Sequence, residues 1–318
     1  MQISFVEPLT PAWERMRRIL FEPFSLATWL VLGFSAWMAG LASGGAWGGG
    51  GRGWTGISDG HSTSAEIDSA IRRLTEHIVW LPLILLGVLL VLALVVLVLW
   101  ISSRAKFVFL DNVVWERAEI VEPWKRLGRL GDSLFWWRLA FVAIVGGLAV
   151  VIAAAVFLPA ASLSFSDTLK GLSIAAVVLG VLAMMVIAVF AFFTLLLLEN
   201  FVIPVMYRFD QTAMDAWRTL LPWLRRYGGW FVGYGALFLV AAVAFQIVLL
   251  VLCLFTCCIV LLPYVGTVIL LPVWVLYRAY SVEFLAQFHS DFDLFAAARA
   301  TAAPATVDLP AEPPEDTP

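Results

Sequence analysis

The chain has few of the residues on which enzymes and metal sites usually depend. Of its 318 residues only three are cysteine and three are histidine, and 14% are charged. The cysteines, Cys253, Cys257 and Cys258, share one apolar stretch, which fits neither a disulfide framework nor a zinc site. The histidines are scattered, and the sequence contains no Gly-x-Ser-x-Gly or His-Glu-x-x-His motif. We therefore expect no enzymatic activity, no metal site and no cofactor.

The chain also lacks long polar segments, so nucleic-acid binding is not expected. What it has instead is apolar sequence: 62% of residues are hydrophobic and the mean hydropathy is +0.94. This content is concentrated in runs of at least about 20 residues, the length that crosses the hydrocarbon core of a bilayer as a helix. The predicted spans are residues 24–43, 78–101, 135–158, 172–202, 230–255 and 264–287. The expected fold is an all-α, polytopic bundle of six transmembrane helices.

The distribution of basic residues predicts the orientation of these spans. Of the twenty Lys and Arg residues, only four lie in the loops of one side, namely Arg52, Arg72, Arg73 and Lys170. The other sixteen fall on the opposite side, and basic loops remain in the cytoplasm. Both termini are therefore predicted to be cytoplasmic, with the protein in the inner membrane of a bacterial cell.

The segments outside the spans differ in character. Residues 1–23 predict an amphipathic helix on the cytoplasmic membrane surface, with Trp13 and Met16 on its apolar face and Arg15 opposite. Residues 24–289 form the membrane domain, and the segments 104–134 and 205–229 predict further amphipathic cytoplasmic helices. The Ala-, Pro- and acid-rich tail, residues 290–318, is predicted to be disordered.

The cytoplasmic segments 104–134 and 205–229 resemble each other. Phe107-Val108 corresponds to Phe201-Val202, and each pair is followed by an acidic residue near a Trp with basic neighbours, then Gly, then Trp and Phe. The offset between the two copies is 93 or 94 residues. This predicts a parallel internal repeat with units at residues 78–158 and 172–255, an arrangement common in transporters.

The best copy of this pattern runs from Phe201 to Phe231, as Phe-Val-x-Pro, then Asp-Ala-Trp-Arg, then Gly-Gly-Trp-Phe. With its looser copy at 107–137, it resembles the six-helix membrane domain found with some glycerophosphodiester phosphodiesterases, and related stand-alone prokaryotic membrane families of unknown function. The resemblance could cover residues 24–289. It implies a fold and a membrane location but no reaction, because the phosphodiesterase activity belongs to a separate soluble domain.

Two groups of charged residues are candidate functional sites. Ionisable residues within apolar runs are expensive, so they are functional hypotheses by default. The candidates for an intramembrane charge network are Arg104, Glu199, Arg278 and Glu283. The alternative is that each side chain separately extends to the lipid headgroups. The candidate lipid- or partner-binding residues of the basic helices are Lys125, Arg126, Arg129, Arg218, Arg225 and Arg226. Asp111 is explained by placement at a helix N-terminus.

Three classes of function are considered. The favoured one is a non-enzymatic membrane protein whose basic helices bind anionic lipids of the inner leaflet or a protein partner, including a second copy of the chain. The alternative is a small-molecule or lipid transporter built on the parallel repeat. An intramembrane enzyme lacks the paired acids or metal cluster that it would need. A cavity bordered by Glu199 and Arg278 would favour the transporter.

Overall fold

The computed structural model describes residues 3–42, 81–163, 170–255, 262 and 264–302. In these ranges the regular secondary structure is helical, without a strand. The elements are α1 (Leu9–Phe21), α2 (Leu26–Gly40), α4 (Leu81–Val114), α5 (Val121–Arg126), α6 (Gly128–Leu163), α7 (Lys170–Leu197), η4 (Leu198–Val202), α8 (Ile203–Phe209), α9 (Ala213–Phe255), α10 (Val265–Ile269), α11 (Leu271–Ala286), η6 (Ser290–Phe292) and α12 (Phe295–Ala302).

Four helical stretches of the described chain are long and apolar enough to cross a bilayer. They are Pro82–Val114, Gly128–Val156, Ala175–Phe209 and Ala213–Leu254. They coincide with the second to fifth spans expected from the sequence, each of which has an apolar run of about the length that lipid requires. These helices support a membrane protein.

The expected first and sixth spans form shorter helices than the sequence predicted. The 24–43 run gives α2, with 15 residues, and the 264–287 run is divided into α10 and the 16-residue α11. The division falls at Leu270, two residues before Pro272, which has no N–H to bond one turn back and so interrupts the helix. Both helices are shorter than the about 20 residues of a standard crossing.

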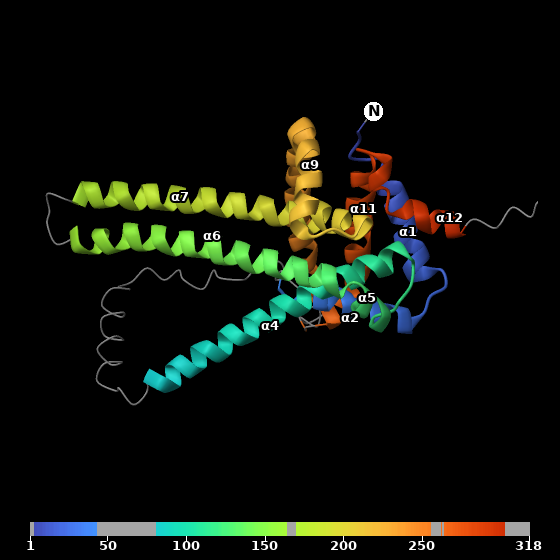
Figure 1. Ribbon diagram of the computed structural model, residues 1–318, viewed down its shortest axis with the longest axis horizontal. Helices are drawn as coiled ribbons and strands as arrows, with labels where there is room; N and C mark the ends of the chain where they lie inside the picture. Colours follow the sequence, from blue (N-terminus) through green and yellow to red (C-terminus); the bar gives the residue numbers. More distant parts are fainter. Residues whose placement is uncertain (1–2, 43–80, 164–169, 256–261, 263, 303–318) are drawn as a thin grey trace, which may run out of the picture.

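The helices converge at one end and diverge at the other (Figure 1). In Figure 1, α6 and α7 run side by side away from the centre, while α4 and α9 leave it in other directions. The outer part of α4 has apolar side chains on all sides, as shown by the consecutive residues 88–91, which are Val, Leu, Leu and Val and are all exposed. In lipid no hydrophobic force drives such surfaces together, so the tightly packed core is confined to the inner ends. This core includes α1, α11, η4, α8 and the inner turns of α4, α6 and α9.

The predicted cytoplasmic helix at 205–229 is not a separate element. Its second part is the beginning of α9, which has 43 residues and contains Pro222. At about 1.5 Å per residue α9 is about 64 Å long, roughly twice the thickness of the hydrocarbon core. The helix bends at Tyr227, whose backbone angles (φ −119°, ψ 24°) are not helical. The bend adjoins Gly228 and Gly229 and follows Pro222, which are common causes of helix kinks.

The N-terminal helix is part of the core, with its faces arranged differently from the prediction. Met16 is buried as expected, but Trp13 is 54% exposed and Arg15 is buried. Arg15 contacts the Glu116 carboxylate at 3.0 Å, and its guanidinium lies 3.7 Å from the centre of the Phe295 ring. Since α1 packs against protein, it can bury an arginine that has these partners.

The beginning of the predicted disordered tail is folded. Residues 290–302 contain η6 and α12, and Phe292, Leu294 and Phe295 are buried in the core. Three apolar side chains within four residues hold this segment against the body of the protein. The Ala- and Pro-rich composition of the whole tail concealed them. The remaining tail, 303–318, and the Gly-rich stretch at 44–60 lie outside the described residues.

We expect the close approach of α6 and α7 to depend on Gly180. A Cβ atom at this buried position would lie 2.7 Å from Cγ2 of Val156, so Gly180→Leu should force the helices apart and cost about 1–3 kcal/mol. Thermal unfolding in detergent measures the loss. Gly146→Leu is the matched control, because a Cβ there has nothing within 4 Å. Equal melting temperatures for the two variants would contradict the prediction.

Candidate functional site

The apolar run of α4 changes near its inner end, where buried polar side chains appear. Ser102, Ser103, Lys106, Asp111 and Asn112 are all nearly or completely buried. They are surrounded by protein because α2, α6, α8 and α11 pack against α4. Polar groups buried in this way require partners, so their contacts define the candidate sites.

Glu199 lies at the centre of the first candidate site. It belongs to η4, a π-helical turn between α7 and α8. Pro204 lies four residues after Asn200 and cannot donate a backbone hydrogen bond to it, which explains why the helix widens here. Such π-turns occur frequently at functional sites.

Three basic side chains from three helices face this carboxylate. Lys106 of α4 forms an ion pair with Glu199, and Arg278 of α11 donates from Nη1 to the Glu199 backbone oxygen at 2.7 Å. Arg138 of α6 interacts electrostatically with Glu199, and its Nη1 lies 3.4 Å from the Ser103 hydroxyl. We call Lys106, Arg138, Glu199 and Arg278 the charge cluster. It has three cationic side chains and one carboxylate, and the three cations are buried.

The sequence-predicted network is only partly present. The structure brings Glu199 and Arg278 together but places Arg104 elsewhere, bound to Asp132 through Nε (2.9 Å) and Nη2 (2.6 Å). Arg104 and Lys106 are two residues apart and therefore point to nearly opposite sides of α4, about 200° apart. The cluster thus uses Lys106 in place of Arg104, which sequence reasoning missed.

Glu283 is also outside the charge cluster. Its electrostatic neighbours are Arg299, Asp293 and Arg15, at the α1 and α12 side of α11. Five residues separate Glu283 from Arg278, which places the two side chains on different faces of the helix. Arg104 and Glu283 thus each have charged neighbours of their own, outside the charge cluster.

A cavity of about 340 Å³ adjoins the charge cluster. Lys106, Glu199 and Arg278 line its polar end. Most of the remaining wall is apolar and comes from α2, α9, α10 and α11: Ala36, Ala39, Phe238, Ala241, Ala242, Phe245, Leu270, Val273 and Trp274. The volume is at the lower end of the range for small-molecule pockets, about 300–1,000 Å³. Thr267 and Gln246, within predicted spans, also line it.

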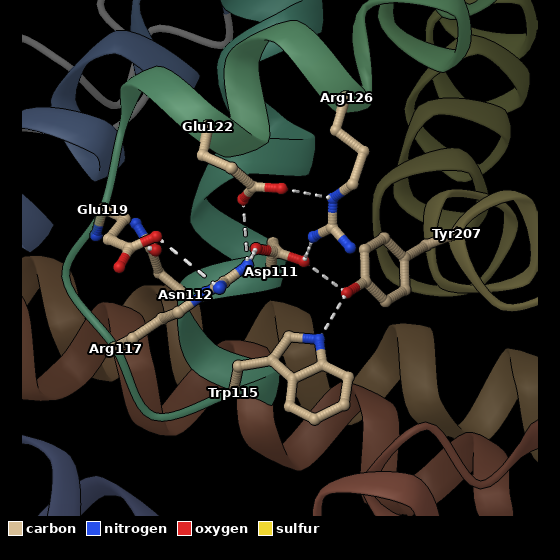
Figure 2. A network of polar contacts seen from close by, with 8 residues as sticks. All are labelled: Asp111, Asn112, Trp115, Arg117, Glu119, Glu122, Arg126 and Tyr207. Carbon is tan, nitrogen blue, oxygen red and sulfur yellow. Dashed lines mark hydrogen bonds and ion pairs between the residues drawn. The ribbon is translucent and has the colours of Figure 1, made fainter.

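The second polar centre surrounds Asp111, whose carboxylate is completely buried (Figure 2). Arg117 donates to Oδ2 at 2.7 Å, Arg126 donates to Oδ1 at 2.6 Å, and the Tyr207 hydroxyl donates to Oδ1. Glu122 pairs with both arginines. The hydrogen bond to Asp111 raises the pKa of the Arg117 guanidinium above its usual value. We call this set the Asp111 network.

The Asp111 network is an anchor between elements rather than a ligand site. It joins the last turn of α4, the following loop, α5 and α8 (Figure 2). Asp111 therefore lies at a helix C-terminal end, and the sequence interpretation that placed it at an N-terminus is wrong. The signal that could have revealed its role is a lone acid in the apolar stretch Phe107–Val114, followed by Arg117.

The six basic residues predicted to bind lipid or a partner are all exposed, but they have different surroundings. Arg126, Arg129 and Arg218 pair with Asp111, Asp210 and Asp215. Lys125, Arg225 and Arg226 form no ion pair within the described part of the chain. The last three are the basic side chains of this set that remain available for an external partner.

The comparisons with known proteins give a family and no activity. The model described as "Family of unknown function (DUF7544)" matches residues 3–285. No curated protein and no solved structure matches the chain. Since the match covers most of its length, the chain belongs to this family.

We predict that Asp111→Asn destabilises the protein by roughly 1–3 kcal/mol, because two arginines lose their buried charged acceptor. Unfolding by denaturant or heat in detergent measures the change. Asp215→Asn is the matched control: Asp215 pairs with Arg218 at the surface, where an ion pair contributes about 0–1 kcal/mol. A stability loss for Asp111→Asn no larger than that of the control would contradict an anchoring role.

Proposed function

We propose that this member of the DUF7544 family is an integral membrane protein that binds a small amphiphilic molecule or lipid in the cavity next to the charge cluster. The observation that carries the proposal is the cavity itself, with charged residues at one end and an apolar wall along the rest. Ligand pockets commonly combine a mainly apolar lining with a few polar groups that fix orientation. A binding protein or transporter for such a molecule would use this site.

Because of the cavity, we now favour binding of a ligand inside the protein over the surface binding that the sequence favoured. The apolar spans favoured surface binding, because too few polar residues were visible for a transport path. Two of the four residues proposed for a charge network, Glu199 and Arg278, do border a cavity. Most of the other cavity residues are Ala, Leu, Val and Phe, which cannot be distinguished from lipid-facing side chains in the sequence. An amphiphile, rather than a strongly hydrated solute, suits this lining.

Our proposed topology keeps the expected orientation, with both termini in the cytoplasm and α2 and α11 as the two further crossings. In support, α1 and α12 lie against each other through Arg15 and Phe295, so the two ends of the described chain are on the same side of the protein. The exposed basic residues of α5, α6 and α9 would face the cytoplasm under the same rule.

We also propose that the two halves of the membrane domain are a parallel repeat. In support, Lys106 and Glu199 are 93 residues apart, which equals the offset between the copies in the sequence. The central ion pair would then join equivalent positions of the two units. In transporters built from repeats the substrate site lies at the repeat interface.

The exposed cations favour a second candidate, a scaffold that binds anionic lipid surfaces or a protein partner. Lys125, Arg225 and Arg226 are exposed and lack a protein carboxylate within the described residues. Each basic residue near an anionic membrane surface contributes about 1 kcal/mol of attraction. This candidate uses the surface and does not need the cavity.

Filling the cavity should abolish ligand retention. In Ala242→Phe the added ring would occupy the space beside Phe238 and Phe245. Native mass spectrometry of protein purified in mild detergent should detect a bound amphiphile in the wild type and at least about tenfold less in the variant, as expected for the loss of about 1.4 kcal/mol or more.

Ala244→Phe is the matched control, since Ala244 lies on the exposed side of the same helix and outside the cavity lining. Retention of the same molecules in the wild type and both variants would contradict the proposed function.

The scaffold candidate makes a separate prediction. Replacing Lys125, Arg225 and Arg226 together by Gln should remove a stoichiometric protein partner from the purified material, while Ala242→Phe should not. Replacing Arg129 and Arg218 by Gln is a control for loss of charge, because both already have carboxylate partners. Purification without any protein partner from the wild type would eliminate this candidate in its protein-binding form.

A further inference from the structure

The charge cluster contains more positive than negative charge. Lys106, Arg138 and Arg278 are 3%, 5% and 8% exposed, and each interacts electrostatically with the Glu199 carboxylate. The neighbouring Arg104 does not change this balance, because Asp132 binds it through both carboxylate oxygens. One carboxylate therefore faces three buried cations.

An excess of buried positive charge is unfavourable without a compensating anion. Removing a charge from water costs several kcal/mol, and pairing with good hydrogen bonds is the usual compensation. The contrast with Asp111 is informative, because that buried carboxylate is matched by two arginines that are partly exposed and share Glu122. In the charge cluster the cations are the buried groups, and two of them, Lys106 and Arg278, line the cavity.

Two hydrogen-bond donors in the cavity wall also favour a ligand that carries acceptor oxygens. Trp274 lies one turn before Arg278 on α11, and its indole Nε1 is buried without a hydrogen-bond partner among the described residues. The buried Thr267 hydroxyl of α10 also lacks a partner within the described chain. Indole N–H can only donate, so it requires an acceptor such as a carboxylate, phosphate or ester oxygen.

The remaining wall of the cavity fits an apolar part of the ligand. Ala241 of α9 and Val273 of α11 line the cavity and are exposed, whereas Lys106 and Arg278 are buried. Both exposed residues belong to apolar helices, so a ligand from the bilayer can reach the cavity from the side. A free inorganic ion would leave the apolar wall without a contact.

We propose that the cavity binds an anionic lipid, whose phosphate or carboxylate head group contacts Lys106 and Arg278 and whose acyl chain lies along Phe238, Ala242 and Phe245. This inference rests on the proposed function and specifies the charge of its ligand. Thr267 and Trp274 donate hydrogen bonds to the oxygens of the head group or its linkage. Glu199 holds Lys106 in place and keeps the excess positive charge moderate.

The test compares two lipids that differ only in the head group. Detergent-solubilised full-length protein is titrated with lysophosphatidic acid and with the monoacylglycerol of the same acyl chain, followed by native mass spectrometry. We expect at least about tenfold tighter binding of the anionic lipid, because hydrogen bonds between ionised groups are stronger than those to a neutral head group. Arg278→Gln should reduce this preference severalfold, and Arg278→Lys should retain most of it.

Arg104→Gln distinguishes electrostatic recognition from loss of structure, because Asp132 binds this arginine and it lies outside the cavity lining. The preference for the anionic lipid should be unchanged in this variant, whereas damage to the fold would weaken the binding of both lipids. An equal reduction in Arg278→Gln and Arg104→Gln would overturn the inference. Melting temperatures of all variants show whether they fold.

The possible results separate the inference from the proposed function. Equal binding of both lipids that Ala242→Phe abolishes overturns the anionic preference and leaves the proposed function intact. Binding of neither lipid overturns both. Competition by inorganic phosphate at the concentration of the lipid would show that a free anion suffices, and would overturn the assignment of a lipid.

Discussion

The ion pair between Lys106 and Glu199 holds the inner ends of the helices together. Lys106 belongs to α4 and Glu199 to the π-turn η4, while Arg278 of α11 binds the backbone oxygen of the same glutamate. Three elements far apart in the sequence are thus fixed through one residue. Removing Glu199 would leave the buried Lys106 ammonium without its carboxylate, which destabilises the folded protein. The cavity wall depends on the same contacts, since Lys106, Glu199 and Arg278 all line it.

The Asp111 network and the charge cluster compensate their buried charges in different ways. Around Asp111 both carboxylate oxygens are bound by donors of the protein, and the two arginines can also reach solvent, since their side chains are 32% and 46% exposed. The charge cluster is less completely matched, with its cations buried and unpaired donors in the adjoining wall. A buried carboxylate whose oxygens are bound by several elements ties those elements together, whereas excess buried cations beside a cavity can accept an outside anion. We therefore assign anchoring to the first centre and propose ligand binding for the second.

The sequence predicted the helical class and the four long spans, because an apolar run of sufficient length has few alternatives in lipid. It did not predict the contacts between spans, since choosing Lys106 rather than Arg104 requires the rotation of α4 relative to its neighbours. The bend at Tyr227 depends on how Pro222 and the glycines after it are accommodated in one continuous helix. The folding of 290–302 was obscured because three apolar anchors were averaged with an Ala- and Pro-rich tail. Local composition was enough to predict the helices. The partner of each charged side chain depends on how the helices pack, which composition does not determine.

The cavity lies where the packed core gives way to the exposed apolar helices, and this position explains why it persists. Closing it by moving α9 and α11 inward would press the Lys106 and Arg278 side chains further from any solvent, at an electrostatic cost that a few apolar contacts do not repay. Moving the helices apart is not favourable either, because in lipid no hydrophobic force acts on their outer surfaces and separation would only lose packing contacts. A molecule with an anionic end and an apolar end resolves both constraints at once. The bilayer supplies such molecules at high local concentration, and the proposed anionic lipid would place its charge beside Lys106 and Arg278 and its acyl chain along α9.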